Sequence, residues 1–172
     1  YATPSPRCLT AMLDLDEERL LAALTHARVA RIVVDAAKGS VPRDAGTWMG
    51  VIEHLTRDDE ALVGTIGGGR LEHDAVAHAR ALLAGSTNET RRRMPLGPSL
   101  GQCCGGVVEL RFELHDAASA AALRSSFERT RGGMQALALF GGGHVGRAIV
   151  RAMAPLPLRL TWIDSRDEIF PE

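Results

Sequence analysis

Residues 61–85 read ALVGTIGGGRLEHDAVAHARALLAG, and this stretch decides the fold class. It opens with a short apolar run at 61–66, which is typical of a strand. The three glycines at 67–69 end that strand, and apolar residues then recur every three or four positions from Leu71 to Leu82. That spacing is typical of an amphipathic helix. A strand that passes through a tight turn into a helix predicts an α/β protein.

The preceding and following sequence adds further strands and a helix. A helix capped by Asp14 or Asp16 is predicted near the start of the chain. Further strands are predicted at residues 29–36, 47–55, 89–94 and 107–114. The strands at 47–55 and 61–66 suit a local antiparallel hairpin. We expect these elements to form a mixed sheet with helices on its faces.

A second strand-turn-helix pattern lies near the end of the chain. A strand predicted at 136–140 is followed by the sequence GGGHVG at 141–146, by a helix through Met153 and by a strand at 158–163. This order is the β-α-β start of a Rossmann-like fold. The expected organisation is a first domain at 1–116, a linker at 117–134 and an incomplete Rossmann-like domain at 135–172.

Length, composition and charge limit the class of protein. With 172 residues, 45% of them hydrophobic and 24% charged, the chain has the composition of a globular protein with a packed core. Its formal net charge of −1 creates no field that would attract nucleic acid or an acidic membrane surface. No apolar run is long enough for a membrane span, and the first ten residues hold no signal-peptide core. We therefore expect a cytoplasmic protein without nucleic acid or membrane partners.

The loop at 39–46 follows the strand predicted at 29–36 and contains Ser40 and Arg43. A guanidinium group and a hydroxyl group beside free backbone amides can hold a phosphate. The same residues also suit a plain connecting turn with a surface arginine.

The glycines Gly67, Gly68 and Gly69 stand between a strand and a helix. Unpaired amide groups at the start of a helix attract anions, and the absence of side chains permits close approach of a ligand. A tight turn in which glycine only permits positive φ explains the same sequence equally well.

Cys103 and Cys104 are adjacent in a loop rich in glycine and proline, residues 95–106. An odd total of three cysteines excludes a secreted disulfide framework, and adjacent cysteines lack the C-x2-C spacing of a zinc site. An accessible thiol in such a loop favours chemistry, and a soft thiolate suits molybdenum, copper or transferred sulfur better than magnesium. The alternative is an inert pair of small residues.

The glycines Gly141, Gly143 and Gly146 follow the dinucleotide-binding pattern GxGxxG, and Asp164 lies at the end of the next predicted strand. In this pattern the glycines turn the chain, admit the pyrophosphate and let the helix pack on the strand, while the acidic residue bonds a ribose hydroxyl. A vestigial nucleotide site fits the sequence equally well.

Four segments, taken in their order along the chain, resemble the XdhC/CoxI family. They are GSVPR at 39–43, GTIGGGRLE at 64–72, GQCCGG at 101–106 and FGGGHVG at 140–146. Four motifs in order are far more specific than any one of them, and together they extend over nearly the whole chain.

This resemblance implies a molybdenum cofactor chaperone rather than an enzyme. Such a protein binds the molybdopterin cofactor, protects it while a cysteine desulfurase sulfurates it, and delivers it to the xanthine dehydrogenase apoenzyme. By the same resemblance, Cys103 or Cys104 would bind molybdenum, the glycine-containing loops would hold the pterin and its phosphate, and the protein would be a homodimer. The sequence does not choose between the two thiols.

Two other functions fit parts of the sequence. The GxGxxG pattern with Asp164 also suits an NAD(P)-dependent oxidoreductase, although no acid or base for the nicotinamide can be picked out. NAD(P) or another nucleotide is therefore a second expected cofactor. The other alternative is a non-catalytic assembly or scaffold protein. In that interpretation the loops are only turns and the cysteines have no biochemical role.

Overall fold

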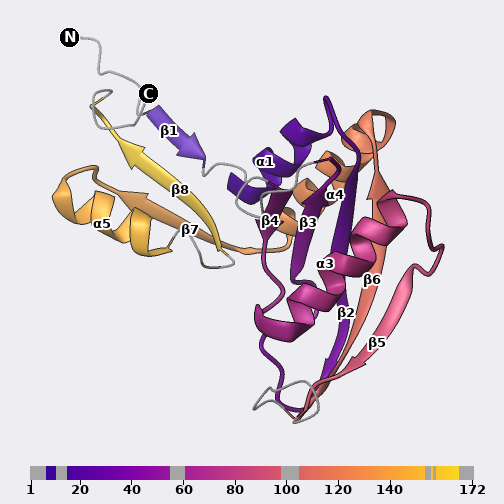
Figure 1. Ribbon diagram of the computed structural model, residues 1–172. Coiled ribbons are helices and arrows are strands. Elements are labelled where there is room, and N and C mark those ends of the chain that lie inside the picture. Colours follow the sequence, from indigo (N-terminus) through magenta and orange to yellow (C-terminus); the bar gives the residue numbers. More distant parts are fainter. Residues whose placement is uncertain are drawn as a thin grey trace. The chain divides into compact units, whose positions relative to one another are not determined.

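The computed structural model describes residues 7–10, 15–54, 61–97, 105–153, 156 and 158–166 (Figure 1). The chain divides into two compact units. The central unit is Asp16–Ala121, and the terminal unit combines Tyr1–Leu15 with Ala122–Glu172.

The helices and strands follow the order expected from the sequence, with ends that differ by a few residues. They are β1 (Arg7–Thr10), α1 (Leu15–Ala23), β2 (Val29–Lys38), β3 (Trp48–Ile52), β4 (Leu62–Gly64), α3 (Gly69–Leu83), β5 (Arg91–Pro95), β6 (Val107–His115), the 3₁₀ helix η2 (Ala117–Ser119), α4 (Ala120–Gly132), β7 (Gln135–Phe140), α5 (His144–Met153) and β8 (Leu158–Asp164). β1 was not predicted from the sequence. Four residues carry too little pattern to be recognised as a strand without their pairing partner.

The central unit is built on a five-stranded sheet with the order β4-β3-β2-β6-β5. The expected α/β fold class is confirmed. The strand pairs in this sheet are all antiparallel, so the sheet is not of the mixed type that we expected. The reason is the path of α3, which follows β4 at one edge of the sheet and leads to β5 at the other edge. A helix on this path does not join two neighbouring parallel strands.

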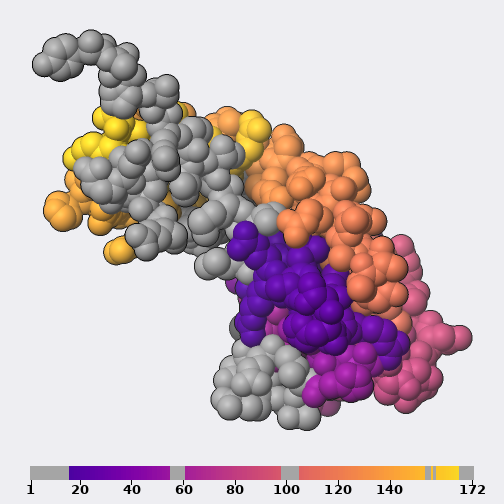
Figure 2. Space-filling view, turned by 90° about the horizontal axis from the view of Figure 1, so that it is seen from above, coloured from indigo at the N-terminus to yellow at the C-terminus, as the bar shows by residue number. Residues whose placement is uncertain are grey.

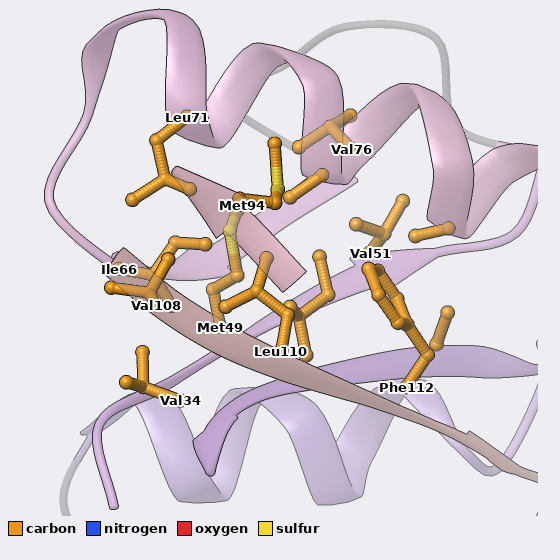
Figure 3. Close-up of a cluster of buried hydrophobic side chains, with 14 of the residues drawn as sticks. Val34, Met49, Val51, Ile66, Leu71, Val76, Met94, Val108, Leu110 and Phe112 are labelled. Carbon is orange, nitrogen blue, oxygen red and sulfur yellow. The ribbon is translucent and has the colours of Figure 1, made fainter. Parts of the chain in front are cut away.

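One face of the sheet packs against α3 and forms the main core (Figure 3). In Figure 3 the side chains of Leu71 and Val76 point from α3 towards Met49, Leu110 and other residues of the strands. Leu71, Met49 and Leu110 are at most 1% exposed. Each such side chain contributes roughly 1.5–3 kcal/mol of stability on burial. This packing fixes the position of α3, and therefore of the glycine turn that precedes it.

α1 packs on the opposite face of the sheet. A Cβ atom at Gly50 of β3 would overlap Leu20 Cδ1, so the absence of a side chain at this position lets the helix approach the strand closely. Leu20 and Leu24 are buried, whereas Glu18 and Arg19 are exposed. Figure 2 shows the indigo segment that includes α1 at the surface of the molecule. The sheet is thus covered on both faces, as predicted.

Arg31 of β2 carries a largely buried charge on the face that packs against α1. Its Nη1 donates to Glu113 Oε2 at 3.2 Å, and its guanidinium carbon lies 5.4 Å from the ring centroid of Trp48. Burial, and then repulsion by Arg111, lower the pKa of Arg31 to about 10. The group therefore remains charged at neutral pH, and Glu113 compensates for its burial.

The terminal unit contains a three-stranded sheet with the order β1-β8-β7. β7 and β8 pair in parallel from Gln135↔Leu158 to Phe140↔Ile163, with α5 between them in the chain. The expected β-α-β segment is therefore confirmed. β1 adds an antiparallel strand to the other edge of β8.

Candidate functional site

The loop that contains Ser40 and Arg43 connects β2 to β3. Its base is closed by two backbone hydrogen bonds, because Gly46 N donates to Val34 O at 2.8 Å and Val34 N donates to Thr47 O at 2.9 Å. Ser40 and Arg43 are exposed at the tip. The loop is thus anchored to the sheet while both predicted phosphate-binding side chains remain accessible.

The triple-glycine turn connects β4 to α3. The φ angles of Gly67, Gly68 and Gly69 are +121°, +74° and +64°. Residues with a Cβ atom rarely adopt these values, so the turn requires glycine at three successive positions. The turn places the start of α3 directly after the edge strand of the sheet.

The amides of this turn are bound by a side chain of α3 that was not among the predicted site residues. Glu72 Oε2 accepts hydrogen bonds from Thr65 Oγ1 at 2.7 Å, from Ile66 N at 3.1 Å and from Gly68 N at 3.0 Å. Gly67 N donates to Thr65 Oγ1 at 3.1 Å. An internal carboxylate therefore stands where an anionic ligand was expected to accept these bonds.

The loop at 39–46 and the triple-glycine turn are in direct contact. A Cβ atom at Gly67 would lie 2.6 Å from both Cβ and Cγ of Pro42 and 3.6 Å from Cγ of Arg43. Gly67 therefore packs flat against Pro42, the residue next to Arg43. The loop at 39–46 and the triple-glycine turn, two of the predicted binding loops, therefore form one cluster.

The last two residues of the cysteine loop join the same cluster. A Cβ atom at Gly106 would lie 2.5 Å from Lys38 O, 2.6 Å from Ser40 O and 2.7 Å from Val41 Cγ1. Leu96 N also donates to Gly106 O at 2.7 Å, which closes the base of this loop. We call the joined segments 38–46, 64–72 and 105–106 the loop cluster. Cys103 and Cys104 lie outside the described residues, and Gly105 follows Cys104 directly in the sequence.

The backbone of the loop cluster is open at two glycines. A Cβ atom at Gly68 or at Gly105 would meet no heavy atom of the described chain within 4 Å. These positions permit a flat ligand to approach the main chain closely. Among the described residues, no three His, Cys, Asp or Glu side chains gather in a way that could hold a metal ion.

The glycine motif of β7 and α5 belongs to the terminal unit. A Cβ atom at Gly146 would overlap Gly141 O, so this glycine lets the start of α5 pack on the turn, the role expected of the third glycine in the motif. Gly141 has a φ of +101°, and its carbonyl oxygen accepts a bond from Trp162 Nε1 at 3.1 Å. Gly143 precedes α5, and its carbonyl accepts from Arg147 N at 3.0 Å.

The structure brings Asp164 to this second turn, as the motif predicts. Asp164 Oδ2 accepts a bond from Gly142 N at 2.5 Å, and Arg166 donates to the same carboxylate from its backbone N at 2.9 Å and from Nε at 3.0 Å. The side chain of Asp164 is 6% exposed. The bonds from Arg166, and then the bond from Gly142, hold the pKa of Asp164 well below its ordinary value.

Comparison with known proteins locates the family resemblance within the central unit. The XdhC and CoxI family is matched by residues 22–93. Over that segment the chain is similar to the XdhC and CoxI family. The segment contains Ser40, Arg43, the triple glycine and Glu72, and it ends before the cysteine loop. The resemblance predicted from the sequence motifs is thereby confirmed for this segment.

Two longer proteins resemble the chain. It is 29% identical over 144 residues to the Escherichia coli (strain K12) protein named "Uncharacterized protein YqeB", covering 81% of this chain and 22% of that protein. Its fold is similar to a crystal structure titled as a xanthine dehydrogenase from Bacillus halodurans, with a TM-score of 0.50 and 23% identity over 69% of this chain and 36% of the other. The chain thus spans about a fifth of the first protein and about a third of the second.

In the ranges that the structure describes, no helix is both long enough and apolar enough to cross a bilayer.

Proposed function

We propose that the chain binds the molybdenum cofactor at the loop cluster and acts in the maturation of xanthine dehydrogenase. The observation that carries this proposal is the contact of three predicted motifs, which meet through Pro42 on Gly67 and through Gly106 on Ser40 and Val41. The family match over residues 22–93 and the fold similarity to a protein titled xanthine dehydrogenase support it.

The residues of the cluster fit the chemistry of this cargo. Ser40 and Arg43 are exposed and offer a hydroxyl and a planar guanidinium to a phosphate group. The open backbone at Gly68 gives a flat pterin ring room to approach the main chain. Cys103 and Cys104 immediately precede Gly105 in the sequence. A thiolate from one of them would supply the soft ligand that molybdenum prefers.

In this function the protein is a carrier rather than a catalyst. It would hold the cofactor away from water while a cysteine desulfurase supplies sulfur, and then transfer it to the xanthine dehydrogenase apoenzyme. We propose a cytoplasmic homodimer for this role. The protein's own groups bind and orient the cargo: Arg43 neutralises the phosphate, and the glycines keep side chains away from the pterin.

This function is tested by measuring how much molybdenum the protein retains. The purified chain is mixed with molybdenum cofactor under anaerobic conditions and desalted, and bound molybdenum is measured by mass spectrometry. We expect about one molybdenum per chain, because the chain holds one cysteine loop. Cys103→Ala or Cys104→Ala should abolish retention, and Cys8→Ala is the matched control. Unchanged retention in the double variant Cys103→Ala with Cys104→Ala would contradict the proposal.

A second candidate function concerns the terminal unit, where we propose that Gly141, Gly143, Gly146 and Asp164 bind a nucleotide. The support is the packing of Gly146 on Gly141 O, which forms the tight turn of the dinucleotide motif, with Asp164 at the end of β8. Calorimetric titration with NAD(H) and NADP(H) tests it, with Asp164→Ala as the variant. Binding that the variant leaves unchanged would contradict this assignment.

A further inference from the structure

We propose that Glu72 determines where an anion binds in the loop cluster: it occupies the amides of the triple-glycine turn as a built-in anion and directs the anionic group of a ligand to Arg43. The inference deepens the proposed function, because it divides the cluster into a part that binds phosphate and a part that rejects it.

The first step is the hydrogen bonding of Glu72. A single carboxylate oxygen, Oε2, receives the Thr65 hydroxyl and the amides of Ile66 and Gly68 at 2.7 to 3.1 Å. Gly67 N is used by Thr65 Oγ1. The consecutive amides 66 to 68 are thus already bound to oxygen atoms of the chain itself. A phosphate could take the amides of Ile66 and Gly68 only by displacing the Glu72 carboxylate.

The second step is the charge around the turn. Arg70 leads α3 but donates through Nε to Asp74 at 2.9 and 3.0 Å, so its charge is compensated. Glu72 adds a negative charge at the turn itself. Asp44 and Arg43 are both exposed on the neighbouring loop. A phosphate near the turn is therefore repelled by Glu72. The cluster also contains the exposed cation Lys38, but Arg43 is the cation whose side chain is placed beside Gly67.

The third step connects Glu72 to the position of Arg43. The hydrogen bonds of Glu72 hold the backbone of residues 65 to 68 in place. Pro42 packs against Gly67, which lies in that segment. Cγ of Arg43 lies 3.6 Å from the position that a Cβ atom would occupy at Gly67. Glu72 is thus a positioning residue for the loop that presents Arg43, as well as the group that blocks the amides.

The test is titration of the ¹⁵N-labelled chain with inorganic phosphate, followed by amide NMR signals. In the native protein we expect saturable shifts at residues 40 to 44 and none at the amides of Ile66 and Gly68. Glu72→Gln removes the charge but keeps an oxygen that accepts hydrogen bonds. It should raise phosphate affinity about fivefold, the effect of about one unit charge at close range in water. Arg43→Gln should abolish saturation.

Glu18→Gln is the matched control, because it removes one carboxylate charge from the exposed surface of α1 and leaves both the amides of the turn and the Arg70–Asp74 pair intact. The proposal is supported if this variant changes phosphate affinity much less than Glu72→Gln. It is overturned if both variants raise affinity equally, if phosphate shifts the Ile66 and Gly68 amides of the native protein, or if no saturable shift occurs. The native titration needs no variant, so it decides the question even if Glu72→Gln fails to fold.

The proposed function and this inference fail in different experiments. Loss of molybdenum retention in the cysteine variants does not depend on where phosphate binds. The phosphate titration is carried out without molybdenum, so either result stands without the other.

Discussion

The chain contains two glycine turns that look alike in sequence and are held in different ways. In both turns a strand leads through glycines into a helix. In both, a carboxylate accepts a hydrogen bond from a backbone amide of the turn. Glu72 lies only four residues after Gly68, on the helix that the turn starts, whereas Asp164 lies 22 residues after Gly142, on the next strand. The first turn is therefore stabilised locally, and the second requires the complete β-α-β segment.

The two turns also differ in what their glycines contact. Gly67 packs against Pro42, which belongs to a separate loop, whereas Gly146 packs against Gly141 of its own turn. The first arrangement joins two loops into a cluster, and the second closes one turn on itself. This contrast is the reason that we propose the first turn, where residues from several loops meet, as the cofactor site.

The largest effect on stability is expected for Gly146→Ala. The new Cβ atom would overlap a backbone oxygen, Gly141 O, so α5 must shift away from the turn, and we expect a loss of about 3 kcal/mol in the terminal unit. Trp162, which donates to Gly141 O, reports the change in urea unfolding once Trp48 is replaced by Phe. Gly143→Ala, where a Cβ atom meets nothing within 4 Å among the described residues, is the control and should cost less than about 1 kcal/mol. Equal losses would contradict the assigned role of Gly146.

A somewhat smaller effect is expected for Gly67→Ala in the central unit. The variant combines a φ of +121° with a clash against Pro42, and we expect a loss of about 2 kcal/mol. Trp48 fluorescence in a Trp162→Phe background follows this unit. Gly105→Ala, whose Cβ atom has open space in the described chain, should change stability by less than about 0.5 kcal/mol. A harmless Gly67→Ala would show that the two loops are not packed as described.

The smallest effect concerns the carboxylate of the second turn and appears only on acidification. The pKa of Asp164 is depressed in the folded state, chiefly by Arg166. Its contribution to stability is therefore complete above the ordinary pKa of 3.8 and is lost as the pH falls through that value towards the lower folded pKa. We expect Asp164→Asn to lower the urea midpoint of the terminal unit at pH 7, and to lower it by less at pH 3, where the loss has begun. An equal difference at both pH values would contradict this linkage.

The sequence predicts the order of elements well, because each carries a local pattern. The alternation of Val108, Leu110 and Phe112 predicts the strand that became β6, and the three glycines predict the turn before α3. Motif spacing also predicts that Asp164 reaches the second glycine turn, because a β-α-β segment has a fixed geometry.

The contacts that make the loop cluster are not predictable in the same way. Pro42 on Gly67 joins segments 25 positions apart, and only the completed sheet brings them together. The sequence also gives no direct indication that Glu72 binds the amides of the turn. The signal that identifies its role is a glutamate four residues after the second of three glycines, which lets the side chain reach back to the turn.

The central claim is that the loop cluster, and not the second glycine turn, holds the molybdenum cofactor. The most direct test is to add the cofactor anaerobically to the ¹⁵N-labelled chain and to map the amide signals that shift. The account predicts shifts at residues 39–46, at Gly68 and Gly69, and at Gly105 and Gly106, with none at Gly141 to Gly146. Shifts confined to Gly141 to Gly146 would contradict it.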